Sequence, residues 1–295
     1  MTNKLHVRGR KLTLSYTVNQ FMKGWTDWRW FYYQFTNHVV PKYFSHKRNS
    51  GVYVWKEDWD NLIILDGCRY DIFAEKLNNS NIHGKMEKRI SRGSSTEEFL
   101  LENFGGGRKF PDIVYITANP FVHTMLDPDT FFKTANVWKG SWDEENGTVM
   151  PSEVVKAALR TYIRYPHKRI IVHFMQPHSP FIGAYSKKGN FWQVALSEGK
   201  NEVMKAYSSN LDLVFPYVKK LLGKLEGKTV VTSDHGEACG ERATFMKIPI
   251  YGHPGGVHIP SLLEVPWLII IHNRPLRETR RRIKDIVNRL KKEEI

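Results

Sequence analysis

Cysteine and long apolar runs are both scarce in this chain. The two cysteines among its 295 residues, Cys68 and Cys239, cannot provide a disulfide framework. No apolar run approaches the roughly 20 residues of a membrane-spanning helix, and no signal-peptide pattern opens the sequence. These absences predict a soluble, cytoplasmic protein, with peripheral membrane contact as the alternative. A hydrophobic content of 41% predicts a well-formed core.

Acidic residues are outnumbered as well. The 30 aspartates and glutamates face 44 lysines and arginines, which leaves a net charge of +14. Such a charge attracts polyanions, whether nucleic acid, anionic lipid or phosphorylated glycan. It equally fits a surface that serves only solubility, because charge alone selects no partner. No motif in the chain indicates specific nucleic-acid recognition.

Short apolar segments alternate with helical patterns over most of the chain. The expected strands are 62–65, 113–116, 170–174, 229–232 and 267–271. The expected helices are 97–103, 152–164, 201–222 and 278–292. This alternation predicts an α/β fold with a mostly parallel central sheet flanked by helices. Residues 127–150 are polar and are expected to form an irregular excursion over the site.

Residues 1–53 lie outside the α/β pattern, so we expect an N-terminal arm followed by one catalytic domain over 54–295. The arm begins with cations and continues with a dense set of rings that includes Trp25, Trp28, Trp30, Phe31, Tyr32, Tyr33 and Phe35. Rings interleaved with cations suit the surface of an anionic membrane. Packing of the rings onto the main domain is the favoured alternative. The expected basic helix 278–292 also allows two interpretations. It either docks on the sheet through its apolar stripe or binds an anionic partner through its basic face.

Two strand ends carry metal-ligand chemistry. The apolar run 62–65 ends in Asp66, and the run 229–232 leads into Asp234 and His235. In open α/β sheets the carboxyl ends of the strands form the ligand-binding edge. An isolated Asp-His-Gly could be a simple turn, but two such strand ends can supply three ligands to one cation. Carboxylate oxygen with imidazole nitrogen suits zinc or manganese better than calcium.

Three motifs together resemble the alkaline phosphatase superfamily, in its sulfatase-like and phospho-headgroup-transferase branch. They are Ile64-Leu-Asp-Gly67, Thr232-Ser-Asp-His-Gly-Glu237, and Gly252-His-Pro254 followed by Glu264-Val-Pro-Trp267. The resemblance covers roughly residues 60–272. It implies an α/β sheet that holds one or two divalent metals, and a threonine, serine or formylglycine nucleophile that attacks a phosphate or sulfate ester.

The resemblance places the nucleophile within residues 89–99. It assigns Thr96 to the nucleophile position, with Ser95 and Ser94 as alternates, and it puts Arg92 on the ester oxygens. The residues themselves also allow a simpler role, since Ser95-x-x-Glu98 is a capping box that starts a helix. The two roles are compatible, because the free amides of a helix N-terminus favour an anionic phosphoryl group.

Histidines are implied to complete the pocket. By resemblance His178 binds the charged group of the substrate or a second metal, and His253 binds a second metal or protonates the leaving group. His258 is either a substrate contact or a loop residue, and His173, inside a strand, is expected to be a core histidine. Gln176 stands where two-metal relatives have a carboxylate, which counts against a full second metal site.

Neither cysteine lies in the Cys-x-Pro-Ser-Arg setting that a formylglycine requires, so phosphate esters are favoured over sulfate esters. The sequence therefore predicts a metal-dependent hydrolase whose anionic ester substrate could be a phosphorylated glycan or lipid. Two alternatives stay open: a transferase that moves a phospho-headgroup onto a glycan or lipid, and a non-catalytic anion-binding protein. The expected metal ligands are Asp66, Thr96, Asp234, His235 and His253.

Overall fold

The computed structural model describes residues 28–44, 49–243 and 248–272, together with the backbone of 6–7 and 10–11 and residue 286. Residues 6–7 and 10–11 form the short antiparallel pair β1 (His6–Val7) and β2 (Arg10–Lys11). The expected helix 278–292 and most of residues 1–27 lie outside the described part of the chain. No helix within that part is long and apolar enough to cross a membrane.

A seven-stranded sheet forms the centre of the described residues, with strand order β4-β13-β10-β3-β9-β5-β6. Its parallel strands are β3 (Asn61–Asp66), β5 (Phe110–Thr117), β6 (Phe131–Asn136), β9 (Arg169–Pro177) and β10 (Gly227–Thr232). The antiparallel strands are β13 (Glu264–His272) and β4 (Lys85–Ile90) at one edge. This mostly parallel sheet confirms the predicted fold class.

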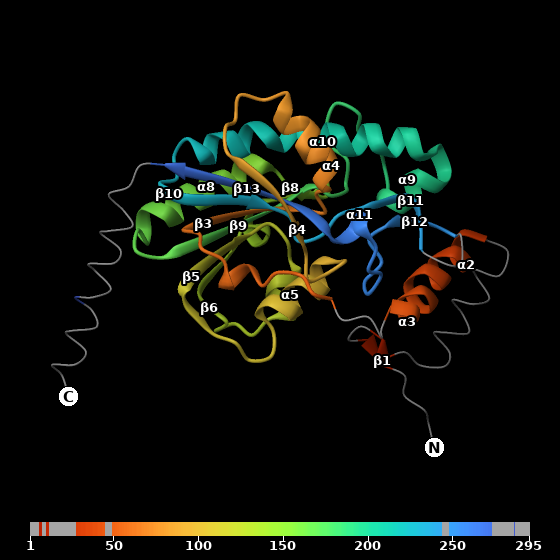
Figure 1. Cartoon of the computed structure of the whole chain (residues 1–295), viewed down its shortest axis with the longest axis horizontal. Coiled ribbons are helices and arrows are strands. Elements are labelled where there is room, and N and C mark those ends of the chain that lie inside the picture. Colours follow the sequence, from red (N-terminus) through yellow and green to blue (C-terminus); the bar gives the residue numbers. More distant parts are fainter. Residues whose placement is uncertain are drawn as a thin grey trace, which may run out of the picture.

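Helices cover both faces of the sheet (Figure 1). On one face lie α4 (Tyr70–Asn78), α8 (Pro151–Arg164) and α10 (Lys200–Leu222), and on the other lie α5 (Thr96–Phe104) and α6 (Phe121–Met125). Because side chains of a strand alternate between faces, Ile63 and Leu65 pack toward α8 and α10 while Leu62 and Ile64 pack toward α5. Strand β3 is thus buried on both sides, as its unbroken apolar run predicts.

The region 127–150 corrects one expectation. It is not irregular: β6 is the edge strand of the main sheet, and α7 (Trp138–Ser141) and the hairpin β7 (Trp142–Asp143)–β8 (Thr148–Val149) follow it. Phe131 is buried against Phe104, Phe110 and Tyr115, whereas Phe132 is exposed. An edge strand with so few buried side chains gives too weak an apolar signal for sequence reasoning to detect.

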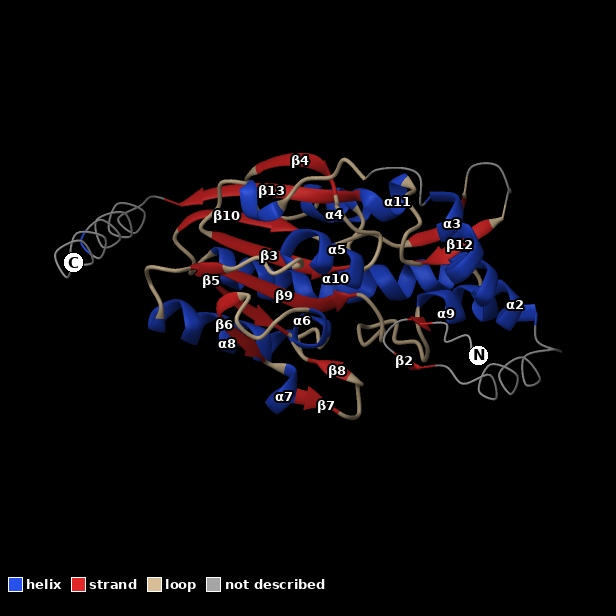
Figure 2. Ribbon diagram, turned by 90° about the horizontal axis from the view of Figure 1, so that it is seen from below, coloured by secondary structure: helices blue, strands red, loops and turns tan. Residues whose placement is uncertain are grey.

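The described part of the arm is a continuous helical segment that packs on the main domain. It consists of α2 (Trp28–Gln34), a π-helical turn over Phe35–Val39, and α3 (Val40–Phe44). Val40 and Phe44 are buried beside the hairpin β11 (Ala238–Arg242)–β12 (Pro249–Gly252). Figure 2 shows α2 and α3 next to β12 and α9 (Phe191–Glu198) at one end of the molecule.

Two short helices complete the described elements. A 3₁₀ turn over Val54–Lys56 leads into β3, and α11 (Pro260–Leu263) leads into β13. Leu262 of α11 is buried with Ala238 of β11, so α11 fixes the backbone around residues 234–238. A Cβ atom at Gly236 would overlap the carbonyl oxygen of Ser261, which explains why a glycine follows His235 at this close approach.

Candidate active site

The carboxyl ends of β3 and β10 bring Asp66, Asp234 and His235 together. The two strands are parallel neighbours, with Ile64 opposite Thr232, so residues that follow each strand emerge at one edge. One ligand atom from each of these three side chains lies within 4.8 Å of the others, and all three are buried. The Nε2 atom of His235 is 3.6 Å from a carboxylate oxygen of Asp66 and 3.6 Å from one of Asp234.

Thr96 supplies the hydroxyl that faces this cluster. It is the first residue of α5, and its Oγ1 donates to Oδ2 of Asp234 at 2.8 Å. The same oxygen is 3.4 Å from Oδ2 of Asp66 and 3.3 Å from Nε2 of His235. Ser95 instead caps α5 by accepting from the Glu98 backbone N–H, and the Ser94 hydroxyl donates to the Glu98 carboxylate. Of the three hydroxyls 94–96, that of Thr96 is therefore the one that contacts the cluster.

Hydrogen bonds fix the two carboxylates, yet leave part of their capacity unused. Asp234 accepts from the backbone N–H groups of Gly67 at 3.0 Å and His235 at 2.9 Å, and Asp66 accepts from the side-chain amide of Asn119 at 2.6 Å. The Oδ1 atom of Asp66 and the Nε2 atom of His173 are buried without a partner. Buried polar groups in native proteins are nearly always satisfied, so these two atoms fit a site that can take a further ligand.

The protonation of this cluster follows from burial and charge. Burial and the neighbouring charge of Asp234 raise the pKa of Asp66 well above its ordinary range. Burial also acts to raise the pKa of Asp234, but His235 and His173 outweigh it and the pKa is lowered. Burial lowers the pKa of His235, and it lowers that of His173 to about 4. Both imidazoles are therefore neutral at physiological pH.

The imidazole of His235 presents a lone pair to the two carboxylates. Its Nδ1 lies 2.8 Å from the carbonyl oxygen of Gly236, which can only accept, so Nδ1 carries the hydrogen. The Nε2 atom is then a hydrogen-bond acceptor that faces the carboxylate oxygens of Asp66 and Asp234, which are also acceptors. A cation between Asp66, Asp234 and His235 relieves this repulsion, and the bond to the Gly236 carbonyl orients the ring as in metal-ligating histidines. The donor set fits a divalent metal.

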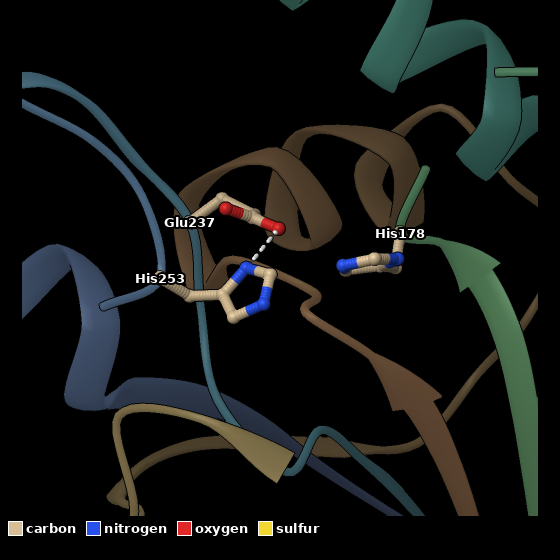
Figure 3. A group of neighbouring side chains, drawn as sticks. All are labelled: His178, Glu237 and His253. Atoms are coloured by element: carbon tan, nitrogen blue, oxygen red, sulfur yellow. Dashed lines mark hydrogen bonds and ion pairs between the residues drawn. The ribbon is translucent and has the colours of Figure 1, made fainter. Parts of the chain in front are cut away.

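A second cluster lies beside the first and consists of His178, Glu237 and His253 (Figure 3). His253 Nδ1 is 2.8 Å from Oε1 of Glu237, and its ring centroid lies 4.8 Å from that of His178 and 4.5 Å from that of His235. His178 Nδ1 is 2.5 Å from the carbonyl oxygen of Ser179, so its Nε2 is also left as an acceptor. His253 thus belongs to the second cluster, and its ring is the part of that cluster that approaches His235 of the first.

Glu237 is a candidate site residue that the sequence motifs did not single out. It is fully buried, its Oε2 has no partner, and burial raises its pKa to about 7. The sequence did contain one indication of its importance, because Glu237 is the last residue of the Asp-His-Gly-Glu motif. Gln176, by contrast, donates to Thr148 and to the Val149 carbonyl. The carboxylate of the second cluster therefore comes from the residue just before β11 and not from the strand end of β9.

Arg92 and His258 are engaged elsewhere. The Arg92 guanidinium forms an ion pair with Glu102 at 2.8 Å and donates to the Gly51 carbonyl at 3.1 Å. His258 Nε2 is 2.7 Å from Oε1 of Glu98. Both side chains thus contact glutamates within the protein, while the Nδ1 atom of His258 is buried without a hydrogen-bond partner. Their expected substrate-binding roles stay predictions. His173, expected to be a core histidine, contacts the Tyr115 hydroxyl but also lies 3.7 Å from Asp234.

A cavity of about 310 Å³ opens beside the second cluster. Its walls come from the arm, from the start of α5 and from the segments that carry the two histidines, and they include Tyr33, Asn37, Ser95, His178, Trp192 and His253. The rings of Tyr33 and Trp192 are 5.5 Å apart at their centroids. The cavity gives a substrate access to the clusters, and the arm forms part of its wall.

Glu98 holds the loop before α5 in place. Its carboxylate accepts from the Ser94 backbone N–H at 2.9 Å and hydroxyl at 2.8 Å, besides its contact with His258. Burial acts to raise the pKa of Glu98, but the bonds with His258 and Ser94 outweigh it and lower the pKa to about 2. The ionised carboxylate therefore stabilises the position from which Thr96 contacts Asp66 and Asp234.

A Glu98→Gln variant is expected to be less stable than the wild type at neutral pH and equally stable near pH 2. Because the folded pKa lies below the ordinary 4.5, the carboxylate contributes up to about 3 kcal/mol above pH 4.5, and this is lost as the pH falls toward 2. Denaturant unfolding at a series of pH values measures the difference. Glu97→Gln is the control, with an expected change below about 0.5 kcal/mol. A pH-independent deficit in Glu98→Gln would contradict the assignment.

Comparison with known proteins gives remote likenesses in fold. No protein-family model and no curated protein matches the chain. The soluble domain of a lipooligosaccharide phosphoethanolamine transferase from Neisseria meningitidis is 13% identical over 70% of this chain and 75% of that one, with a TM-score of 0.45. The C-terminal periplasmic domain of a phosphoethanolamine transferase from Campylobacter jejuni is 15% identical over 71% and 78%, with a TM-score of 0.45. An alkaline phosphatase superfamily protein from Vibrio parahaemolyticus is 14% identical over 82% and 69%, with a TM-score of 0.40.

These neighbours come from the superfamily and branch that the sequence motifs resemble. The likenesses are remote, with identities of 15% and below and TM-scores of 0.45 and below, so function has to be argued from the residues of the site. The comparison corrects the expected location. The prediction of a cytoplasmic protein is wrong by this measure, because the Campylobacter neighbour is a periplasmic domain.

Proposed function

We propose that this protein is a metal-dependent enzyme that cleaves phosphate esters with Thr96 as its nucleophile. One observation carries the proposal: the Thr96 hydroxyl is 2.8 Å from the Asp234 carboxylate and 3.3 Å from the Nε2 lone pair of His235, at the start of a helix. A lone hydroxyl at a helix N-terminus is a cap. A hydroxyl held against two buried carboxylates and a neutral imidazole is a nucleophile beside a metal site.

Asp66, Asp234 and His235 would hold the metal, with the Thr96 oxygen completing the set. Two carboxylates, one imidazole and a hydroxyl oxygen suit zinc or manganese. When bound there, such an ion acts as a Lewis acid on the ester oxygen and lowers the pKa of the hydroxyl. The unpartnered Oδ1 of Asp66 supports this assignment, because it leaves one carboxylate oxygen for a ligand that is not a protein group.

The chain's own residues supply the remaining steps. The Asp234 carboxylate accepts the hydrogen of the Thr96 hydroxyl, and the amides at the N-terminus of α5 favour the anionic phosphoryl group. The Thr96 oxygen bonds to phosphorus while the bond from phosphorus to the leaving alcohol breaks. A proton held between Glu237 and His253 passes to the leaving oxygen. Water or an acceptor alcohol then bonds to phosphorus and gives its proton to the Glu237–His253 pair, while the bond from phosphorus to the Thr96 oxygen breaks and that oxygen regains its hydrogen from Asp234.

The acceptor decides between hydrolase and transferase. Both reactions share the first half, in which Thr96 becomes phosphorylated, and water in the second half gives a hydrolase. The cavity beside His178 and His253 is the observation that keeps the transferase as a candidate, because about 310 Å³ has room for an acceptor larger than water. The net charge of +14 favours an anionic substrate, such as a phosphorylated glycan or lipid, in either reaction.

A panel of aryl phosphates and aryl sulfates, assayed with zinc, manganese and a chelator, tests the proposal. We expect turnover of the phosphates with manganese or zinc and its loss on chelation, with the sulfates much slower. Addition of an alcohol acceptor separates the two reactions, since a transferase produces a new ester in place of free phosphate. A folded protein that turns over no phosphate ester with any divalent metal, yet binds the anions, would identify a non-catalytic binding protein instead.

Replacing His253 by glutamine is expected to slow poor leaving groups more than good ones. A general acid contributes about 10²–10⁴-fold to rate when the leaving oxygen needs a proton, and little when the leaving group is stable as an anion. Turnover of an alkyl phosphate should therefore fall by at least about 10²-fold, and turnover of a nitrophenyl phosphate far less. Equal losses for both substrates would rule out proton donation by His253.

A further inference from the structure

The outward face of the arm helix carries a cluster of exposed apolar side chains. Trp28 is 58% exposed, Phe31 44%, Val39 47% and Tyr43 38%. Phe31, Phe35 and Val39, together with Ile248, line a shallow apolar groove along this face. The opposite face of the same segment is already used, since Val40 and Phe44 are buried in the main domain. The segment 28–44 is thus apolar on both sides.

Such a segment needs a second partner. A helix that packs on its own domain with one face normally shows polar residues on the other, and an exposed apolar cluster marks an interaction site. Single exposed apolar residues, such as Ile163 on α8, are normal and indicate nothing. In residues 28–44, by contrast, four exposed apolar side chains lie on one short segment, which is found at one end of the molecule (Figures 1 and 2).

Charge identifies the partner. Arg29 and Lys42 are exposed on this segment, and residues 28–44 contain no acidic residue. Across the first 50 residues of the sequence there are nine lysines and arginines and one acid, Asp27. A second copy of the chain would bring two equally basic segments together, which is unfavourable. Exposed rings flanked by cations match the interface of a bilayer that contains anionic lipid.

We propose that the outer face of residues 28–44 docks on an anionic lipid bilayer. The rings of Trp28, Phe31 and Tyr43 enter the headgroup region, and the cations bind lipid phosphates. Tyr33 and Asn37 of the same segment line the catalytic cavity, so docking holds the mouth of that cavity about one helix diameter, roughly 10 Å, from the lipid surface. The docking itself needs neither metal nor Thr96, and it stands independently of the proposed catalysis.

Co-sedimentation with vesicles tests the proposal. We expect the full chain to bind vesicles of phosphatidylcholine with phosphatidylglycerol, to bind pure phosphatidylcholine weakly, and to lose affinity as salt is added. The double variant Trp28→Ser/Phe31→Ser should reduce the partition coefficient at least about tenfold, and Arg29→Gln/Lys42→Gln should reduce it about tenfold and flatten its salt dependence. Ile163→Ser is the matched control, and it should bind as the wild type does.

Three outcomes overturn the proposal. The first is absence of binding to the anionic vesicles, and the second is unchanged partition in both double variants. The third is a wild-type dimer that Trp28→Ser/Phe31→Ser converts to a monomer, because a second copy would then occupy the face. Thermal unfolding and turnover of a soluble aryl phosphate, which the arm variants should leave unchanged, exclude misfolding. They also separate a failure of docking from a failure of catalysis.

Discussion

Replacing Thr96 by alanine is expected to reduce phosphate-ester turnover by about 10⁴-fold or more, because the variant has no oxygen to accept the phosphoryl group. The Thr96 hydroxyl lies 2.8 Å from Asp234 and no other hydroxyl of residues 94–96 contacts the cluster. Thr96→Ser keeps the oxygen and should retain turnover within about tenfold. Steady-state kinetics of the metal-loaded proteins make the measurement.

Ser95→Ala is the matched control for this variant. Ser95 is the adjacent hydroxyl, and its side chain accepts the Glu98 backbone N–H at the N-cap of α5. Loss of an N-cap costs about 1 kcal/mol of folding stability and should leave turnover largely unchanged. The reverse result, with Ser95→Ala inactive and Thr96→Ala active, would move the nucleophile by one residue and contradict the geometry described here.

Replacing Asp66 by asparagine is expected to abolish metal binding without harming the metal-free fold. The pKa of Asp66 is raised by burial and by the charge of Asp234, so the metal-free protein disfavours the ionised carboxylate, and asparagine has nearly the same size without that charge. Metal binding requires the ionised carboxylate. In the wild type, metal at about 100 times its Kd adds about 2.7 kcal/mol to stability, and this increment should vanish in the variant.

Because the Asp66→Asn variant binds metal more weakly, its turnover at a fixed metal concentration should fall by about 10³-fold or more. Unfolding measured with and without manganese or zinc separates a loss of metal binding from a loss of stability in the metal-free protein. Asp129→Asn is the control: its carboxylate is exposed and pairs with Lys109, so neither metal-dependent stability nor turnover should change. A metal-dependent increment that survives in Asp66→Asn would exclude Asp66 as a ligand.

The proximity of the three side chains in the first cluster could be predicted because each lies at or just after the end of a strand that is buried on both faces. Strand β3 reads as an unbroken apolar run that ends at Asp66, and β10 runs straight into Asp234 and His235. Parallel neighbours in register bring such strand ends together wherever the connecting chain runs. The strand pattern alone therefore determines that these three side chains meet.

The second cluster could not be predicted in the same way. Glu237 and His253 are brought together by the hairpin of β11 and β12, in which Ala238 pairs with Gly252. These are short strands of mixed polarity, with a bulge and a loop between them, and their sequences give no periodic signal. The ion pair of Arg92 with Glu102 could not be predicted for a related reason, because Glu102 lies one turn of α5 beyond the nearest motif.

Crystals of the protein grown with manganese, with anomalous scattering recorded from the metal, test the central claim most directly. The account predicts one strong anomalous peak bonded to carboxylate oxygens of Asp66 and Asp234 and to Nε2 of His235, with the Thr96 oxygen within coordination distance. A peak located elsewhere, or a fully loaded crystal in which Thr96 points away from the metal, would contradict it.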